Sequence, residues 1–142
     1  MNILVLNGPN LNLLGEREPE IYGNDTLEEL MMWLETSSDG RNHKFKFYQS
    51  NHEGNLIDAI HDERQWANGM IINPGALSHY SYAIRDAISS TGIPTVEVHL
   101  SHIMDREDFR KISVIKDVCI SQVYGLGKKS YIEGLKILNE IY

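Results

Sequence analysis

Five short apolar segments alternate with amphipathic segments along the chain, and this alternation limits the possible folds more than any other feature. The apolar segments have the length of strands and cover residues 2–7, 44–49, 70–73, 95–100 and 118–123. Helical spacing of apolar residues follows a capping box at Thr26 and Glu29 and recurs at 56–67, 77–88 and 128–141. Strands that alternate with helices imply right-handed βαβ crossovers and a parallel sheet covered on both faces.

The number of these units indicates the fold class. Five units in 142 residues predict an α/β domain, a flavodoxin-like three-layer sandwich with a five-stranded parallel sheet. No linker, repeat or low-complexity stretch divides the chain, so residues 1–142 are expected to form a single domain. The helix at 77–88 is expected to bury one face that contains Leu77, Tyr80, Ile84 and Ile88. A short helix is expected within residues 101–111.

Charge and cysteine content argue against several classes of function. The net charge of −7 and the isoelectric point near 5.3 disfavour nucleic-acid or anionic-membrane binding, because a non-specific grip on phosphates needs a basic surface. The single cysteine, Cys119, allows no intrachain disulfide and no Cys-based metal cluster, and it is expected as a small buried residue in the fifth strand. This cysteine content fits a reducing cytoplasm, so a cytoplasmic protein is expected. The first apolar run is too short for a membrane span and lacks the basic region of a signal peptide.

Polar residues gather where the predicted strands end. In a doubly wound sheet, ligands bind beyond the carboxyl ends of the strands. The candidate residues there are Asn7, Asn10, His52, Glu53, Asn73, Glu97 and His99. The connection from residue 8 to residue 24 is long for a βα loop, and long ordered loops at this edge are commonly lids or binding loops.

Two groups of residues have the chemistry of an acid and a base. Glu97 and His99 alternate along one strand, so both side chains are expected on one face, where the carboxylate can fix the imidazole tautomer and favour its protonated form. From spacing alone, a solvated histidine at a strand end fits equally well. Arg17 and Tyr22 share the long loop, where surface positions are the more common role for such residues. No phosphate-binding loop is present, which disfavours a flavin- or nucleotide-binding domain.

Five motifs, in order and over essentially the whole chain, are similar to those of the type II 3-dehydroquinate dehydratases. They are Leu6-Asn7-Gly8-Pro9-Asn10-Leu11-Asn12, Gly15-Glu16-Arg17 followed by Tyr22-Gly23, Gln49-Ser50-Asn51-His52-Glu53-Gly54, Ile72-Asn73-Pro74-Gly75-Ala76 and Val96-Glu97-Val98-His99-Leu100-Ser101. The resemblance implies a homododecamer of four trimers. It also implies a shikimate-pathway lyase that needs no cofactor or metal and removes water from 3-dehydroquinate to form 3-dehydroshikimate.

The resemblance also assigns roles to individual residues. Tyr22 would remove the proton alpha to the ketone, with Arg17 stabilising the negative charge. His99 would protonate the departing hydroxyl, held in place by Glu97, and Asn10 would orient a water at the enolate oxygen. The residues that match substrate-binding positions are Asn73, His79, Asp86, Leu100, Ser101 and Arg110.

Two further features concern details of that site. The residue at the Asp86 position reaches the site of a neighbouring subunit in the family, and Arg106 with Arg110 resembles the family's arginine-bearing segment. The stretch 112–114 departs from a commoner polar-aromatic pattern. The alternative function is a non-catalytic module that binds a small carboxylate on the same fold, although such a binder has no need of both a base and an acid.

Overall fold

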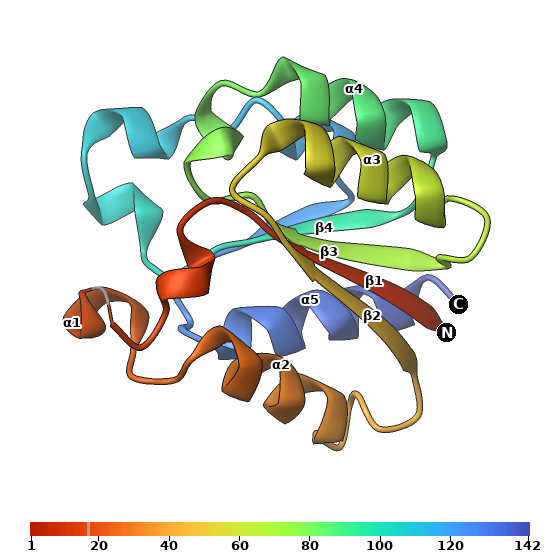
Figure 1. Ribbon diagram of the computed structural model, residues 1–142, viewed down its shortest axis with the longest axis horizontal. Helices are drawn as coiled ribbons and strands as arrows, with labels where there is room; N and C mark the ends of the chain where they lie inside the picture. Colours follow the sequence, from red (N-terminus) through yellow and green to blue (C-terminus); the bar gives the residue numbers. More distant parts are fainter. Residues whose placement is uncertain (17) are drawn as a thin grey trace.

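The computed structural model contains a five-stranded, fully parallel sheet between two layers of helices (Figure 1). The structure describes residues 1–16 and 18–142. The strands are β1 (Asn2–Asn7), β2 (Lys44–Gln49), β3 (Gly69–Asn73), β4 (Thr95–Val98) and β5 (Ser121–Val123). They lie in the order β2-β1-β3-β4-β5, which confirms the predicted flavodoxin-like three-layer sandwich.

Four helices cover the sheet, two on each face. Helices α2 (Leu27–Thr36) and α5 (Lys129–Glu140) lie on one face, and α3 (Glu53–Glu63) and α4 (Tyr82–Thr91) lie on the other (Figure 1). Successive strand residues point to opposite faces, so Ile3 and Val5 pack on the α2/α5 side while Leu4 and Leu6 pack on the α3/α4 side. This alternation gives the sheet two apolar cores and explains why residues 3–6 of β1 and 70–72 of β3 are apolar without interruption.

Shorter elements occupy the connections. Helix α1 (Pro19–Tyr22) belongs to the long loop after β1, and the remaining turns are 3₁₀ helices: η1 (Leu11–Leu13), η2 (Gly75–His79), η3 (Ile103–Asp105), η4 (Asp108–Lys111) and η5 (Lys116–Val118). The predicted capping box starts α2, with the Thr26 hydroxyl accepting from the amide of Glu29 and the Glu29 carboxylate accepting from the amide of Thr26. The short helix expected within 101–111 corresponds to two 3₁₀ turns rather than one helix.

The expected helix at 77–88 is wrong in its extent. It is divided at Ser81, whose hydroxyl caps the start of α4 by accepting from the amide of Ile84 at 3.0 Å. The 3₁₀ turn η2 precedes this cap and rotates the chain, so Tyr80 is 62% exposed instead of lying on the buried face with Leu77 and Ile84. A hydroxyl cap within an apolar period therefore divided what the spacing predicted as one helix.

Three other predicted boundaries differ from the structure. Helix α3 covers 53–63 rather than 56–67, because the chain turns after Glu63 so that the amide of Asn68 can reach the carbonyl of Asn2. Strand β4 ends at Val98. Strand β5 begins only at residue 121, and the half-buried Cys119 precedes it, so its expected place within the strand was wrong.

The loops after β1 and β3 meet at the carboxyl edge of the sheet. The chain leaves β1 for β2 on one side and later adds β3 on the other, so the edge between β1 and β3 is the topological switch point. A Cβ atom on Gly8 would lie 2.5 Å from the carbonyl oxygen of Pro74, so only glycine permits this approach. In the described part of the chain, no helix combines the length and apolar character needed to cross a membrane.

Candidate active site

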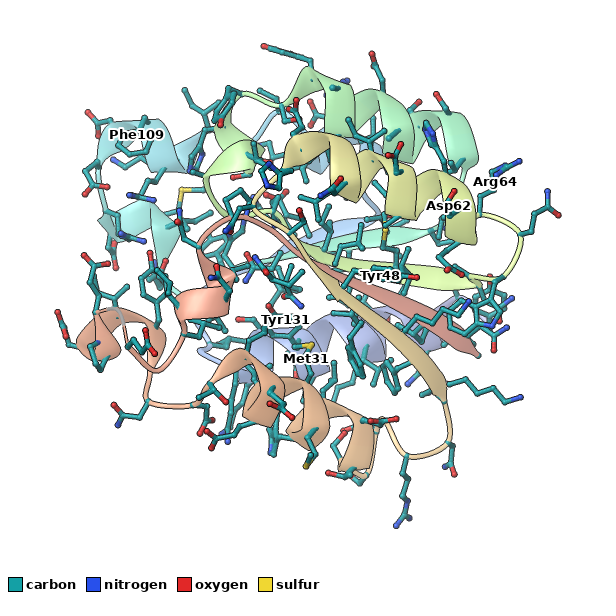
Figure 2. The ribbon with its side chains drawn as sticks, in the orientation of Figure 1. Met31, Tyr48, Asp62, Arg64, Phe109 and Tyr131 are labelled. Atoms are coloured by element: carbon teal, nitrogen blue, oxygen red, sulfur yellow. The ribbon has the colours of Figure 1, made fainter. Side chains whose placement is uncertain are left out.

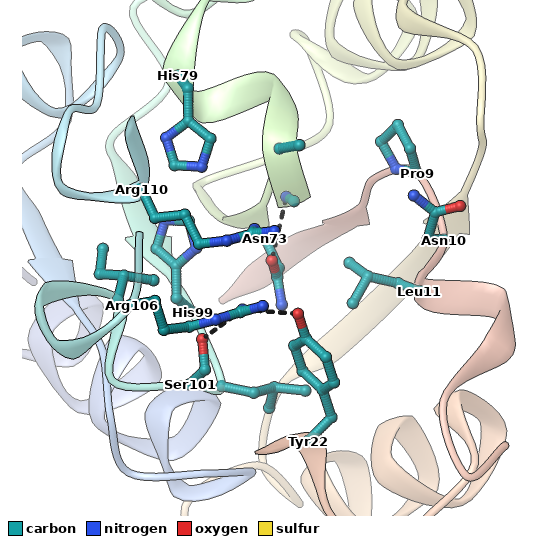
Figure 3. Close-up of a pocket in the computed structure, with 14 residues that line it drawn as sticks. Pro9, Asn10, Leu11, Tyr22, Asn73, His79, His99, Ser101, Arg106 and Arg110 are labelled. Atoms are coloured by element: carbon teal, nitrogen blue, oxygen red, sulfur yellow. Dashed lines mark hydrogen bonds between the residues drawn. The ribbon is translucent and has the colours of Figure 1, made fainter. Parts of the chain in front are cut away.

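A polar pocket opens at this switch point (Figure 3). The loop after β1, the ends of β3 and β4, and the turns η3 and η4 all contribute to its wall. Its lining includes Asn10, Tyr22, Asn73, His79, His99, Leu100, Ser101, Arg106 and Arg110. Eight residues proposed from sequence therefore lie around one cavity, although they are distributed between positions 10 and 110.

His99 and Glu97 form a buried hydrogen-bonded pair at the end of β4. His99 Nε2 lies 2.7 Å from Glu97 Oε1, and the side chain of Glu97 is fully buried. A carboxylate only accepts, so Nε2 donates and Nδ1 remains as the ring nitrogen available to a ligand. The alternation of Glu97 and His99 correctly predicted their adjacency, and the alternative of a solvated histidine is wrong because His99 is 6% exposed.

Ser113 holds the other side of the Glu97 carboxylate. Its hydroxyl oxygen lies 2.9 Å from both carboxylate oxygens and accepts from the amides of Ile115 and Lys116 at 3.3 and 3.2 Å. The buried charge is therefore held by a hydroxyl that backbone donors orient in turn. Sequence reasoning did not find Ser113, since nothing in the spacing connects positions 97 and 113.

Arg106 contacts Tyr22 across the mouth of the pocket (Figure 3). Its Nη1 donates to the Tyr22 hydroxyl at 2.7 Å and to the Ser101 hydroxyl at 3.3 Å. The guanidinium carbon lies 5.4 Å from the centre of the Tyr22 ring. The contact therefore places a fixed positive charge beside the Tyr22 hydroxyl oxygen at the mouth of the pocket.

His79 and Arg110 form the opposite wall. His79 Nδ1 donates to the carbonyl of Ile112 at 2.7 Å, and burial lowers the pKa of the imidazole below its ordinary value of 6.5. At neutral pH the ring therefore offers Nε2 as an acceptor. Arg110 forms an ion pair with Glu107, and its guanidinium lies 4.7 Å from the centre of the Phe109 ring. These contacts place a cation and a neutral imidazole beside the same cavity.

Two residues in the loops after β1 and β2 and one at the end of β3 complete the cavity or position its wall. Asn10 adopts a left-handed conformation with φ of 70°, and its backbone amide donates to Asn51 Oδ1 at 2.9 Å. Asn73 is 3% exposed, and its Oδ1 accepts from the amide of Gly75 at 3.3 Å. These contacts hold the β1 and β3 loops in the positions that shape the pocket.

One of the predicted residues is not part of this arrangement, and the structure does not describe a second. Asp86 is exposed on α4 and does not line the pocket of its own chain. Arg17 lies outside the described residues. Within 1–16 and 18–142, no three His, Cys, Asp or Glu side chains come together in a group that could hold a metal ion.

Comparison with known proteins decides the family. Residues 1–139 match the family model described as Dehydroquinase class II. The chain belongs to this family. It is 54% identical to the 3-dehydroquinate dehydratase of Caldicellulosiruptor saccharolyticus, over 98% of this chain and 97% of that protein. It is 52% identical to the Bacillus subtilis 3-dehydroquinate dehydratase, over 92% of this chain and 88% of that protein.

A solved structure agrees with this dehydroquinase assignment. The type II dehydroquinase from Butyrivibrio crossotus superposes with a TM-score of 0.94 and 49% identity, covering 98% of this chain and 97% of that one. The resemblance expected from the five motifs is therefore confirmed. The chain is an enzyme, a hydro-lyase of the type II 3-dehydroquinate dehydratase class.

Proposed function

We propose that this pocket converts 3-dehydroquinate to 3-dehydroshikimate, with Tyr22 as the base and His99 as the acid. The observation that carries the proposal is that a phenol next to a guanidinium and an imidazole paired with a buried carboxylate line the same cavity. They come from different elements, the loop after β1 and the end of β4. A base and an acid on separate elements suit an elimination in which a proton and a hydroxyl leave from different carbons.

The first step is removal of the alpha proton. A free tyrosine ionises only near about pH 10, so a base of this kind needs a neighbouring cation. Arg106 supplies one for Tyr22, and the family resemblance gives Arg17 the same role. The Tyr22 oxygen takes the proton, and the bonding electrons move into an enolate. Asn10 is proposed to orient a water that donates to the enolate oxygen.

The second step expels the hydroxyl. The enolate electrons re-form the ketone and create the conjugated double bond, while the bond between carbon and hydroxyl breaks. His99 gives its Nδ1 proton to that hydroxyl, which leaves as water, and Glu97 holds the ring through Nε2. The proton gained by Tyr22 then returns to His99 through solvent, and the enzyme is restored.

The remaining polar groups are proposed to hold the substrate. Arg110 provides a positive charge for the carboxylate, and the residues assigned to substrate hydroxyls and backbone contacts are Asn73, His79, Leu100 and Ser101. A non-catalytic module that binds a small carboxylate would need the arginine but not the paired acid and base. The test is to add 3-dehydroquinate and record the ultraviolet absorbance of the enone; binding without new absorbance would contradict the proposal.

Assembly and location belong to the same proposal. We infer a cytoplasmic homododecamer of four trimers in which the exposed Asp86 approaches the pocket of a neighbouring subunit. The purified protein should then elute near twelve times 16.2 kDa. In addition, Asp86→Ala should reduce activity even though this residue does not line the pocket of its own chain. Full activity in a monomer would disprove the proposed assembly.

A further inference from the structure

Two asparagines point their amides into the apolar layer beneath the active site. Asn7 ends β1, Asn73 ends β3, and the two are partners in the register of the sheet. They are 1% and 3% exposed, and both project toward the α2/α5 face, where Tyr131 of α5 is fully buried. Figure 2 shows Tyr131 and Met31 on this side of the sheet. Buried amides in such a layer need partners, since an unpaired one costs free energy.

A chain of hydrogen bonds satisfies these groups. The Tyr131 hydroxyl donates to Asn7 Oδ1 at 2.6 Å and accepts from Asn73 Nδ2 at 3.0 Å. Burial raises the pKa of the Tyr131 phenol, so the hydroxyl keeps its proton. The three side chains therefore connect β1, β3 and α5 directly below the pocket.

The groups at the two ends of this row of hydrogen bonds fix which atom donates and which accepts. Asn7 Nδ2 faces the Met31 sulfur at 3.5 Å, which can only accept. Asn73 Oδ1 faces the amide of Gly75 at 3.3 Å, which can only donate. A flipped Asn73 amide would place two donors together at Gly75 and would require the Tyr131 proton to turn away from Asn7. The network therefore specifies which edge of Asn73 carries the oxygen.

We propose that Tyr131, supported by Asn7, is a positioning residue for substrate binding that holds the Asn73 amide in one orientation toward the pocket. This inference rests on the proposed role of Asn73 in the substrate site. Asn73 and Gly75 line the pocket, whereas Tyr131 and Asn7 do not, so Tyr131 acts only through the amide. With one Nδ2 proton bound to Tyr131 and one Oδ1 lone pair bound to Gly75, the amide keeps one donor and one acceptor site. A substrate hydroxyl, which both donates and accepts, matches this pair.

The test removes only the hydroxyl of Tyr131. Tyr131→Phe should raise KM for 3-dehydroquinate about tenfold while kcat stays within about threefold, the pattern of lost ground-state binding. In an Asn73→Ala background the same change should alter KM less than about twofold, because the Asn73 amide through which Tyr131 acts is already absent. Thr95→Val is the matched control. It also removes a buried hydroxyl hydrogen bond, to the carbonyl of Ile93, but at the opposite end of the sheet, so KM should not change.

Each outcome supports or overturns one specific claim. An unchanged KM in Asn73→Ala would overturn the role of Asn73 and, with it, this inference. If Asn73→Ala raises KM but Tyr131→Phe does not, only the positioning role fails. An equal KM increase for Tyr131→Phe in both backgrounds would also overturn it, since Tyr131 would then act by general destabilisation. Should Tyr131→Phe fail to fold, Asn7→Leu, which removes the acceptor that orients the Tyr131 proton, must raise KM at unchanged kcat or the proposal is wrong.

Discussion

The guanidinium of Arg106 donates a hydrogen bond of 2.7 Å to the hydroxyl of Tyr22, although 84 residues separate them in the sequence. It also donates to Ser101, so its position is defined by two oxygen atoms at the mouth of the pocket. A charge-assisted hydrogen bond to this phenol oxygen would stabilise the anion that the proposed proton abstraction requires. In the proposed mechanism, Arg106 is therefore the residue that supports Tyr22 as the base.

Replacing this arginine by lysine keeps the charge but removes the planar guanidinium, whose Nη1 donates to both hydroxyls from a fixed direction. Arg106→Lys should lower kcat about tenfold to a hundredfold, the range for one hydrogen bond to a charged group. The control is Arg64→Lys, which changes an exposed arginine at the other end of the molecule (Figure 2). Steady-state rates equal to the unmodified enzyme would show that Arg106 does not support Tyr22.

The role of Tyr22 as the base can be tested with a change of one hydroxyl. Tyr22→Phe should reduce kcat at least about a hundredfold, because a general base is lost. Exchange of the substrate alpha proton with deuterated solvent, followed by NMR, should be absent. The control is Tyr142→Phe, which removes a hydroxyl that donates to the carbonyl of Asn68. In this control the substrate alpha proton should exchange at the normal rate. Exchange at the normal rate in Tyr22→Phe would identify another base.

His99 should control the second step rather than the first. His99→Ala should also lower kcat at least about a hundredfold, yet the enolate can still form and revert. Alpha-proton exchange is therefore expected to outpace product formation in deuterated solvent. Glu97→Gln should give the same pattern more weakly, since the imidazole loses its charged partner. A turnover equal to that of the unmodified enzyme in His99→Ala would rule out this acid.

Chelation should leave the activity intact. The proposed mechanism uses side chains and an oriented water, and the residues that the structure describes contain no cluster of three metal-binding groups. Rates measured before and after prolonged dialysis against EDTA should agree. Loss of activity that zinc or magnesium restores would contradict this mechanism.

Stability should depend on pH through Glu63. Its carboxylate accepts from Lys46 at 2.7 Å and from Tyr48 at 3.0 Å, and the Lys46 bond holds the pKa of Glu63 below its ordinary 4.5. The folded state then binds fewer protons than the unfolded state. This stabilisation is therefore present above pH 4.5 and is lost as pH falls through the lower folded value.

Glu63→Gln should remove that part of the pH dependence. Because the Lys46 side chain is 41% exposed, solvent screens the pair, and the free energy of unfolding at pH 7 should fall by no more than about 1 kcal/mol. The effect is measured as the free energy of unfolding in urea at several pH values between about 3 and 7, the range in which carboxylates titrate. Glu140→Gln, at an exposed position, is the control. If Glu63→Gln lost as much unfolding free energy on acidification as the unmodified protein does, the assignment to Glu63 would be refuted.

Local patterns in the sequence determined the fold and the Glu97–His99 pair. Strand and helix periods depend on backbone geometry within a few residues, so the five strands, the α2 capping box and the two-residue alternation on β4 could all be predicted. The extent of the helix predicted at 77–88 was wrong, because the Ser81 hydroxyl caps α4 and divides that helix, and apolar periodicity does not detect such a cap. The five motifs added the residues around the pocket by resemblance.

Only the tertiary structure decided which distant side chains touch. Arg106 and Tyr22 are 84 residues apart, Ser113 lies 16 residues beyond Glu97, and Tyr131 is 124 residues from Asn7. These contacts exist because the strand order places β1 beside β3 and the packing of α5 directs Tyr131 under both strand ends. A periodic pattern specifies which face a residue occupies, but the arrangement of whole elements decides what it meets there.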